Sequence, residues 1–205
     1  MRSGMLRRFT AGAVVSGLVL AGVLMTSASP AAQTRGADET SMSVRRALER
    51  LPYYGVFDYM AFGVDRGTVT LMGYAYHGTL RSAAETAVKR TSGVDEVANQ
   101  LEILPVNQND DRIRWETFYR IYTDTALSRY APGGGHFVVR DLIQSSRFPG
   151  MQPLGSYPIH IIVKNGRTTL LGAVGSRMDR QIAETRAREV SGAFSVENEL
   201  TISTK

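Results

Sequence analysis

The feature that most constrains this chain is a repeat of its own sequence at an offset of 99 residues. Residues 64–73 match residues 163–172, and residues 92–103 match residues 191–202. The register holds without a gap over 40 positions, 15 of which are identical. A repeat of this length indicates two tandem copies of one structural unit.

Hydrophobic spacing predicts how each copy begins. In the first copy, Val44, Leu48 and Leu51 fall on one face of a helix, and apolar residues then alternate over 60–64 and 69–71 as they do in strands. A two-residue turn lies between the strands of each copy, Arg66-Gly67 in the first and Asn165-Gly166 in the second. Asn-Gly is a strong hairpin signal because both residues tolerate positive φ.

The remainder of each copy reads as a second helix and a last strand. Apolar residues over 80–88 follow helical spacing, and residues 97–103 alternate. Gly93 and Gly192 stand where a helix C-cap in the left-handed region is expected. The sequence therefore predicts an α+β fold of two tandem αββαβ units, each a three-stranded mixed sheet packed on two helices.

This pattern resembles the BON domain, the bacterial osmotic-stress and nodulation domain. The family motif is a strand, a glycine turn, a strand ending in Leu-x-Gly, a helix, and Gly-Val-x-x-Val-x-Asn-x-Leu. Its positions are Gly67, Leu71, Gly73, Gly93, Val94, Val97, Asn99 and Leu101 in the first copy, and Gly166, Leu170, Gly172, Gly192, Val196, Asn198 and Leu200 in the second. The second copy has Ala193 where valine is usual. The resemblance implies a non-enzymatic envelope module that associates with phospholipid.

The first 31 residues have the features of a secretory signal peptide. Three arginines at 2, 7 and 8 precede an uncharged apolar stretch of 15 residues, Ala11–Met25, and Ser29-Pro30-Ala31 suits signal peptidase. The stretch is shorter than the about 20 residues that a membrane span needs. We expect cleavage and a periplasmic location, with an uncleaved N-terminal anchor as the alternative.

The rest of the chain divides by composition. The polar residues 32–42 are interpreted as a linker, 43–104 as the first BON domain, 105–112 as a second linker and 113–205 as the second domain. The second domain departs from the first at its start. Its first helix is expected from Ile113 to Tyr130, and an insertion over 132–157 follows, a length that is often functional.

Composition excludes several classes of function. The net charge of +5 falls to about +2 once the three arginines of the signal segment are removed, too weak for a nucleic-acid protein. It permits attraction to an anionic membrane surface. The chain has no cysteine, which excludes disulfides, thiol catalysis and cysteine-based zinc sites.

No catalytic or metal-binding constellation emerges. The three histidines (His77, His136 and His160) are far apart, and Gly133–Gly135 lacks the Lys-Ser/Thr of a phosphate loop. Asn109–Asp111 lacks the ligand spacing of a calcium loop and is interpreted as solvated linker, and His160 as a solvated strand position. We therefore expect no enzyme activity, no cofactor and no metal.

Two polar pairs recur at equivalent positions and are expected to be structural. Glu85 and Glu184 flank buried alanines, which favours an exposed helix face over a general base. Asn99 and Asn198 share the parity of buried strand residues. Because a buried amide must be hydrogen-bonded, each is expected to tie its strand to a neighbouring loop.

Two clusters are candidates for binding lipid or a partner. The first joins helix arginines to the aromatic segment that follows: Arg45, Arg46, Arg50, Tyr53, Tyr54, Phe57 and Tyr59. Tyrosines beside basic residues suit a membrane interface, and the alternative is that the rings pack between the two units. The second cluster lies in the insertion: Arg140, Arg147 and Phe148.

These observations favour a periplasmic protein that binds anionic phospholipid surfaces and supports envelope integrity or stress tolerance. The alternative is an interaction or scaffolding module of the envelope that recognises a protein partner.

Overall fold

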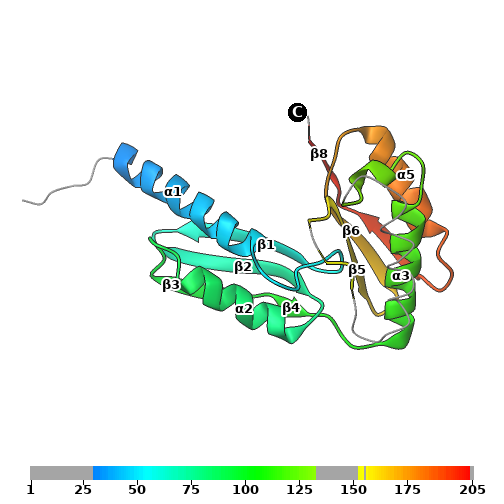
Figure 1. Cartoon of the computed structure of the whole chain (residues 1–205), viewed down its shortest axis with the longest axis horizontal. Coiled ribbons are helices and arrows are strands. Elements are labelled where there is room, and N and C mark those ends of the chain that lie inside the picture. The colour runs from blue at the N-terminus through cyan, green and yellow to red at the C-terminus, as the bar shows by residue number, and fades with distance from the viewer. Residues whose placement is uncertain (1–29, 133–151, 155, 204–205) are drawn as a thin grey trace, which may run out of the picture.

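The computed structural model describes residues 30–132, 152–154 and 156–203, which form two α+β units (Figure 1). The first unit contains α1 (Pro30–Glu49), β1 (Tyr59–Asp65), β2 (Thr68–Ala75), α2 (Gly78–Lys89), β3 (Glu96–Asn99) and β4 (Glu102–Ile103). The second contains α3 (Gln108–Tyr122), the 3₁₀ turn η1 (Ser128–Tyr130), β5 (Ile159–Lys164), β6 (Arg167–Val174), α5 (Arg177–Arg188), β7 (Ser195–Asn198) and β8 (Thr201–Ile202).

The duplication holds at the level of structure. Residues 68–75 and 167–174 form the middle strands, and residues 78–89 and 177–188 form the second helices, so equivalent elements begin and end 99 residues apart. Each sheet has the same order, with β1 or β5 antiparallel to the middle strand and the last strand parallel to it. The last strand of each unit is split into two segments that pair with the same middle strand: β3 and β4 pair with β2, and β7 and β8 pair with β6. The predicted αββαβ topology is confirmed.

Both predicted hairpin turns have positive φ at both central residues, 44° and 82° at Arg66-Gly67 and 52° and 74° at Asn165-Gly166. Gly93 and Gly192 also have positive φ, 83° and 84°. They are not helix caps, however, because α2 and α5 end earlier, with Arg90 and Glu189 as their C-cap residues.

Each sheet buries one face against its two helices. In the first unit, α1 contributes Val44 and Leu48 and α2 contributes Ala84 and Val88 to a core that includes the strand residues Val69 and Leu71. The core of the second unit contains the equivalent Leu170 and Ala183, among others, and is larger. It also contains four buried residues from the first unit: Val56, Phe57, Tyr76 and Leu104.

The segment interpreted as a linker at 32–42 lies within α1, because a polar composition indicates solvent exposure and not an irregular backbone. The N-terminal end of α1 projects away from the sheet (Figure 1). Among the described helices, none combines the length and the apolar character that crossing a membrane requires.

The second interpreted linker, 105–112, also differs from the structure. Asn107 caps α3, accepting from the amides of Asn109 and Asp110. Asp110 is fully buried and accepts hydrogen bonds from the backbone amides of Asn165 (2.8 Å) and Gly166 (2.7 Å). It was expected to be solvated, and instead it fixes the hairpin turn of the second unit.

The first helix of the second unit is shorter than expected. It ends at Tyr122, and the chain then turns and forms η1, so the helical spacing that extends to Tyr130 spans two separate elements.

Candidate functional site

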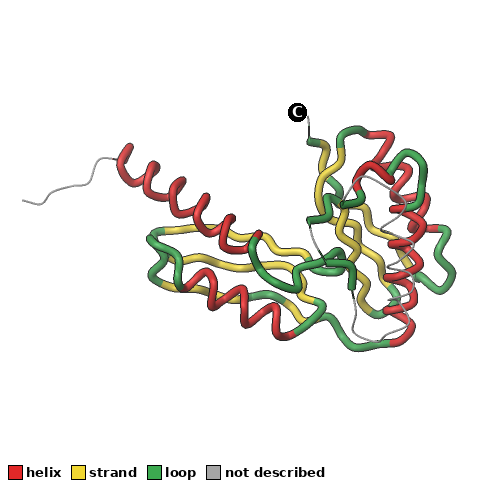
Figure 2. Tube along the Cα trace, in the orientation of Figure 1, coloured by secondary structure: helices red, strands yellow, loops and turns green. Residues whose placement is uncertain are grey.

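The two units interlock through the loop that joins α1 to β1, which reaches the strands of the second unit (Figure 2). The carbonyl of Val56 accepts from the amide of Ile161 in β5 (2.8 Å), and the amide of Val56 donates to the carbonyl of Pro153 (3.1 Å). Gly55 and Leu154 form an antiparallel bridge. A segment of the first unit therefore lies along the edge of the second sheet.

Aromatic side chains from this loop fill the space between the units. Phe57 is fully buried and meets Trp115, Tyr76 and Phe118 edge-on, at centroid distances of 5.5, 5.7 and 6.4 Å. Of the two interpretations of the aromatic segment, packing between the two units is therefore correct for Phe57, and contact with a membrane is not.

His160 is buried with an exposed fraction of 6%, which contradicts the expectation of a solvated position. Its ring lies 5.5 Å from that of Tyr54 and 5.6 Å from that of Tyr59. Burial lowers its pKa to about 4, so the imidazole is neutral in the folded protein. The outer face of the second sheet is thus covered by the first unit at this point.

Asp58 and Gln152 hold this junction together, and no pattern in the sequence singles out either residue. The Asp58 carboxylate accepts from the amides of Gly55 (2.9 Å) and Tyr76 (2.6 Å) and from Nε2 of Gln152 (2.7 Å). Burial raises the pKa of Asp58 while these hydrogen bonds oppose the rise. Gln152 also donates to the carbonyl of Tyr53 (3.1 Å).

A buried arginine makes a further link between the units. Arg114 of α3 pairs with Asp111, donates to the carbonyl of Val163 (2.5 Å), and lies 5.1 Å from the ring centroid of Tyr76. The Tyr76 hydroxyl donates to Asp111 (3.0 Å). Burial raises the pKa of Tyr76 to about 12, so it stays protonated.

The recurring asparagines are structural, but they bind a helix and not a loop. Nδ2 of Asn99 donates to the carbonyl of Arg81 (3.0 Å) and to Glu85 (3.1 Å), and its Oδ1 accepts from the amide of Leu101 (3.2 Å). Asn198 makes the same three contacts in the second unit, with Arg180, Glu184 and Leu200. Glu85 and Glu184 are therefore engaged with the sheet, and hydrogen bonds from Lys89 and Arg188 respectively are the first cause of their lowered pKa values.

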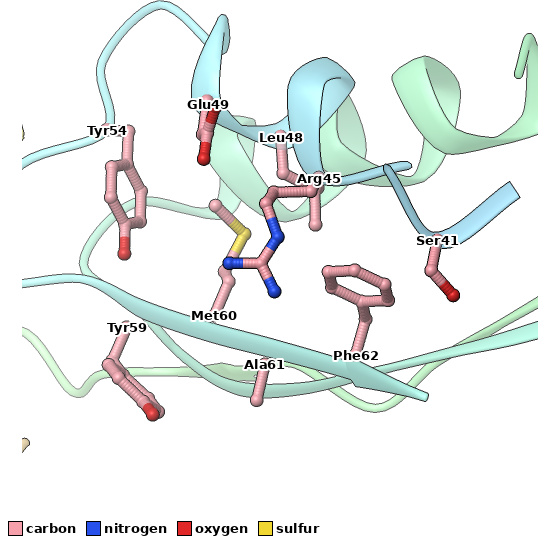
Figure 3. A pocket seen from close by; sticks show the side chains of 9 residues that line it. All are labelled: Ser41, Arg45, Leu48, Glu49, Tyr54, Tyr59, Met60, Ala61 and Phe62. Atoms are coloured by element: carbon pink, nitrogen blue, oxygen red, sulfur yellow. The ribbon is translucent and has the colours of Figure 1, made fainter. Parts of the chain in front are cut away.

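A groove of about 490 Å³ between α1 and β1 brings together three of the sequence candidates, Arg45, Tyr54 and Tyr59 (Figure 3). It is lined by Ser41, Arg45, Leu48, Glu49, Tyr54, Tyr59, Met60, Ala61 and Phe62. Four consecutive residues of β1 line it, so the groove follows the backbone of that strand as well as its side chains. We call it the α1–β1 groove.

The α1–β1 groove combines apolar side chains with two charged ones, Arg45 and Glu49. The guanidinium of Arg45 lies between Met60 and Phe62 (Figure 3), and within the described part of the chain it has no hydrogen bond or ion pair. Tyr54 stands at one end, and burial raises the pKa of its hydroxyl, which therefore stays protonated. Such a groove can accept an apolar side chain and a polar or anionic group together.

The outward face of α1 carries the remaining candidates. Arg46 and Arg50 are exposed on the helix outside the α1–β1 groove, Arg45 is exposed where it lines that groove, and within the described residues none of the three forms an ion pair. Met42 and Tyr53 are also exposed, with fractions of 53% and 63%. We call these five residues the α1 basic face.

The other candidates lie elsewhere. Arg140, Arg147 and Phe148 fall outside the described residues, as does most of the 132–157 insertion. Within the described part of the chain, no group of three or more histidine, aspartate or glutamate side chains is arranged to hold a metal ion.

Comparison with known proteins adds the following. Two chains of CdsD, a structural protein of the type III secretion system of Chlamydia trachomatis, are 11% identical to this chain. The match to its C-terminal domain covers 79% of this chain and 96% of that one with a TM-score of 0.25, and the other match covers 82% and 93% with a TM-score of 0.26. Scores this low support no inference about fold or function. The curated proteins give no significant match.

The family model of the BON domain matches residues 39–105 and 145–204, which together make up more than half of the chain. Both regions contain a hairpin, a helix and a parallel last strand in the same register. The chain belongs to the BON domain family and carries two copies of the domain.

Proposed function

We propose that this chain is a non-enzymatic protein of the bacterial cell envelope, exported to the periplasm, that attaches to anionic phospholipid surfaces through the α1 basic face. The observation that carries the proposal is the set of three exposed arginines without anionic partners in the described chain, flanked by exposed Met42 and Tyr53. Arginines attract the headgroups, and the apolar and tyrosine side chains suit the interfacial layer.

The expected affinity follows from the charge count. Each basic residue near an anionic surface contributes about 1 kcal/mol, so three contribute about 3 kcal/mol, or about a hundredfold in binding. Salt weakens such an attraction because the Debye length falls from about 10 Å at 0.1 M to about 3 Å at 1 M.

The test is vesicle co-sedimentation with residues 32–205, the chain expected after signal cleavage, so that the apolar stretch 11–25 does not contribute to binding. Binding to vesicles rich in phosphatidylglycerol should exceed binding to phosphatidylcholine vesicles and should weaken with salt. Arg46→Glu with Arg50→Glu removes about 2 kcal/mol of attraction and adds repulsion, so it should reduce binding by at least about thirtyfold.

The matched control is Arg167→Glu with Arg177→Glu, which changes the net charge equally at exposed positions of the second unit. It should retain most of the binding. Equal loss in both double variants, or equal binding to neutral and anionic vesicles, would show that α1 is not the attachment surface.

A further inference from the structure

The outer edge of the second sheet is occupied. Ile159 donates its amide to the Tyr122 hydroxyl (3.3 Å), and its carbonyl accepts from the same hydroxyl (2.6 Å). The amide of Ile161 donates to the carbonyl of Val56, and the carbonyl of Val163 accepts from Arg114. Alternate residues of β5 thus direct their backbone amides and carbonyls away from β6, and these groups form hydrogen bonds on the outer side of the strand.

Among the residues that the structure describes, none covers the outer edge of the first sheet at the equivalent place. Met60, Phe62 and Val64 stand 99 residues before those three, in the same antiparallel register with β2. Tyr54 lines the groove beside Met60, and its hydroxyl lies within 3.4 Å of Nε2 of His160. Within the described part of the chain, however, no carbonyl takes the place of Val56 at the amide of Phe62, and the α1–β1 groove lies there instead.

We propose that the α1–β1 groove binds an extended peptide segment of a partner protein by strand addition. A carbonyl of the peptide accepts from the amide of Phe62, and an aromatic side chain on the next peptide residue lies beside Arg45 and Leu48. This goes beyond attachment to phospholipid and does not depend on it.

The template for this occupant is in the same chain. In the second unit, Val56 supplies the carbonyl at the strand edge, and the next residue, Phe57, packs its ring against Trp115 and Phe118 of the first helix of that unit. The α1–β1 groove offers the corresponding surfaces, a strand edge on one side and α1 on the other. An aromatic ring there can stack with the guanidinium of Arg45, which has no other partner in the described chain.

The open backbone edge favours a peptide over a lipid acyl chain. Amide and carbonyl groups on a strand edge are satisfied by another extended backbone, which is how strand addition provides affinity. An acyl chain would leave them without partners. A second copy of the chain is disfavoured as well, because its own 55–57 segment is already engaged on β5.

The test uses a fluorescein-labelled peptide with the sequence of residues 52–59, Pro-Tyr-Tyr-Gly-Val-Phe-Asp-Tyr, and the protein purified from the envelope of an expressing bacterium. Anisotropy should show saturable binding, which replacing the peptide phenylalanine by alanine weakens about tenfold. Amide exchange followed by NMR should slow about tenfold at Phe62 on binding, while amides of β5 stay unchanged.

Ser41→Trp should fill the groove from α1 and lower peptide affinity about tenfold, while Thr86→Trp on the exposed face of α2 should leave it unchanged. Circular dichroism checks that both variants fold. The Arg46→Glu, Arg50→Glu variant should still bind the peptide, so failure of this inference and failure of lipid attachment are distinguishable.

Three results would overturn the proposal. The first is no saturable binding up to millimolar peptide, and the second is protection at β5 in place of Phe62. The third has two parts: phosphatidylglycerol vesicles or self-association of the protein displace the peptide, and Ser41→Trp abolishes the vesicle binding or the self-association. The groove would then be a lipid site or a dimer site.

Discussion

Phe57 is the side chain that most directly couples the two units, so Phe57→Ala should both destabilise the protein and separate the unfolding of its halves. The ring is fully buried and makes three edge-on aromatic contacts, two of them with α3 of the second unit. Truncating a buried phenylalanine costs about 3–5 kcal/mol, and the aromatic pairs place this residue in the upper part of that range.

The assay is urea unfolding followed by two signals. Trp115 is the only tryptophan of the chain and lies 5.5 Å from Phe57, so its fluorescence reports the junction. Far-ultraviolet circular dichroism reports both units. With a denaturant slope of about 2 kcal/mol per molar urea, a loss of about 4 kcal/mol lowers the midpoint by about 2 M. The fluorescence transition should precede the dichroism transition in the variant and coincide with it in the unmodified protein.

The control is Phe194→Ala, which removes the same atoms from a side chain that is 81% exposed. Its effect should stay within about 0.5 kcal/mol. If Phe57→Ala lowers the midpoint no more than Phe194→Ala does, or if its two transitions still coincide, the reasoning that Phe57 couples the units is wrong.

Three further predictions concern single positions. Burial lowers the pKa of His160 from 6.5 to about 4, so between these values the unfolded chain binds a proton that the folded chain does not. The free energy of unfolding should therefore fall by about 3 kcal/mol as the pH drops through this window, and urea titrations at several pH values measure that slope. His160→Asn should remove most of the slope. The raised pKa of Asp58 has the opposite effect on stability, but it is present in both proteins and does not affect the comparison. Gly73→Ala, with φ of +117° and a new Cβ 2.2 Å from a carbonyl oxygen of β1, should cost about 1–3 kcal/mol in thermal unfolding, whereas Gly63→Ala meets nothing within 4 Å and should not destabilise. Asp110→Ala leaves the hairpin amides of Asn165 and Gly166 without their acceptor and should cost about 1–3 kcal/mol, with faster amide exchange at that turn as the specific readout.

The fold could be predicted from the sequence because the signals that specify it are local and occur twice. Alternation marked the strands, Asn165-Gly166 marked a turn with positive φ, and the repeat showed that both halves obey one pattern. The polar stretch at 32–42 was different, since it is helical and composition alone does not distinguish a solvated helix from a linker.

Contacts between the units could not be predicted in the same way. Alternation placed His160 on the outer face of its strand, but it cannot show that Tyr54 and Tyr59 of the other unit cover that face. Asp110 lies in a run of polar residues, and its partners are 55 and 56 residues away, at Asn165 and Gly166. Burial that depends on a distant segment leaves no periodic trace in the local sequence.

The candidate site was predicted in part for a similar reason. Arg45, Tyr54 and Tyr59 were selected from composition, and the structure brings them into one groove with Met60 and Phe62. The groove itself depends on β1 being an edge strand, which follows from the order of strands in the sheet and not from the residues of β1.

The two units share a backbone plan and differ in what closes their outer edges. An unpaired strand edge is a site for adding another strand, and folded proteins usually cover it. In the second unit, Tyr122 and Arg114 from α3, together with Val56, cover the edge. In the first unit, α1 supplies Arg45 beside the edge, and within the described residues no carbonyl reaches the amide of Phe62, so the units differ in the segments that reach the edge, among them the Val56 loop, and not in the order of their strands. Arg46 and Arg50 do not line the α1–β1 groove, so one helix can hold a membrane surface on its outward side while its inward side receives a peptide. If both proposals hold, the first unit binds one peptide per chain and the second unit none, and lipid attachment brings that groove to the membrane surface without occupying it.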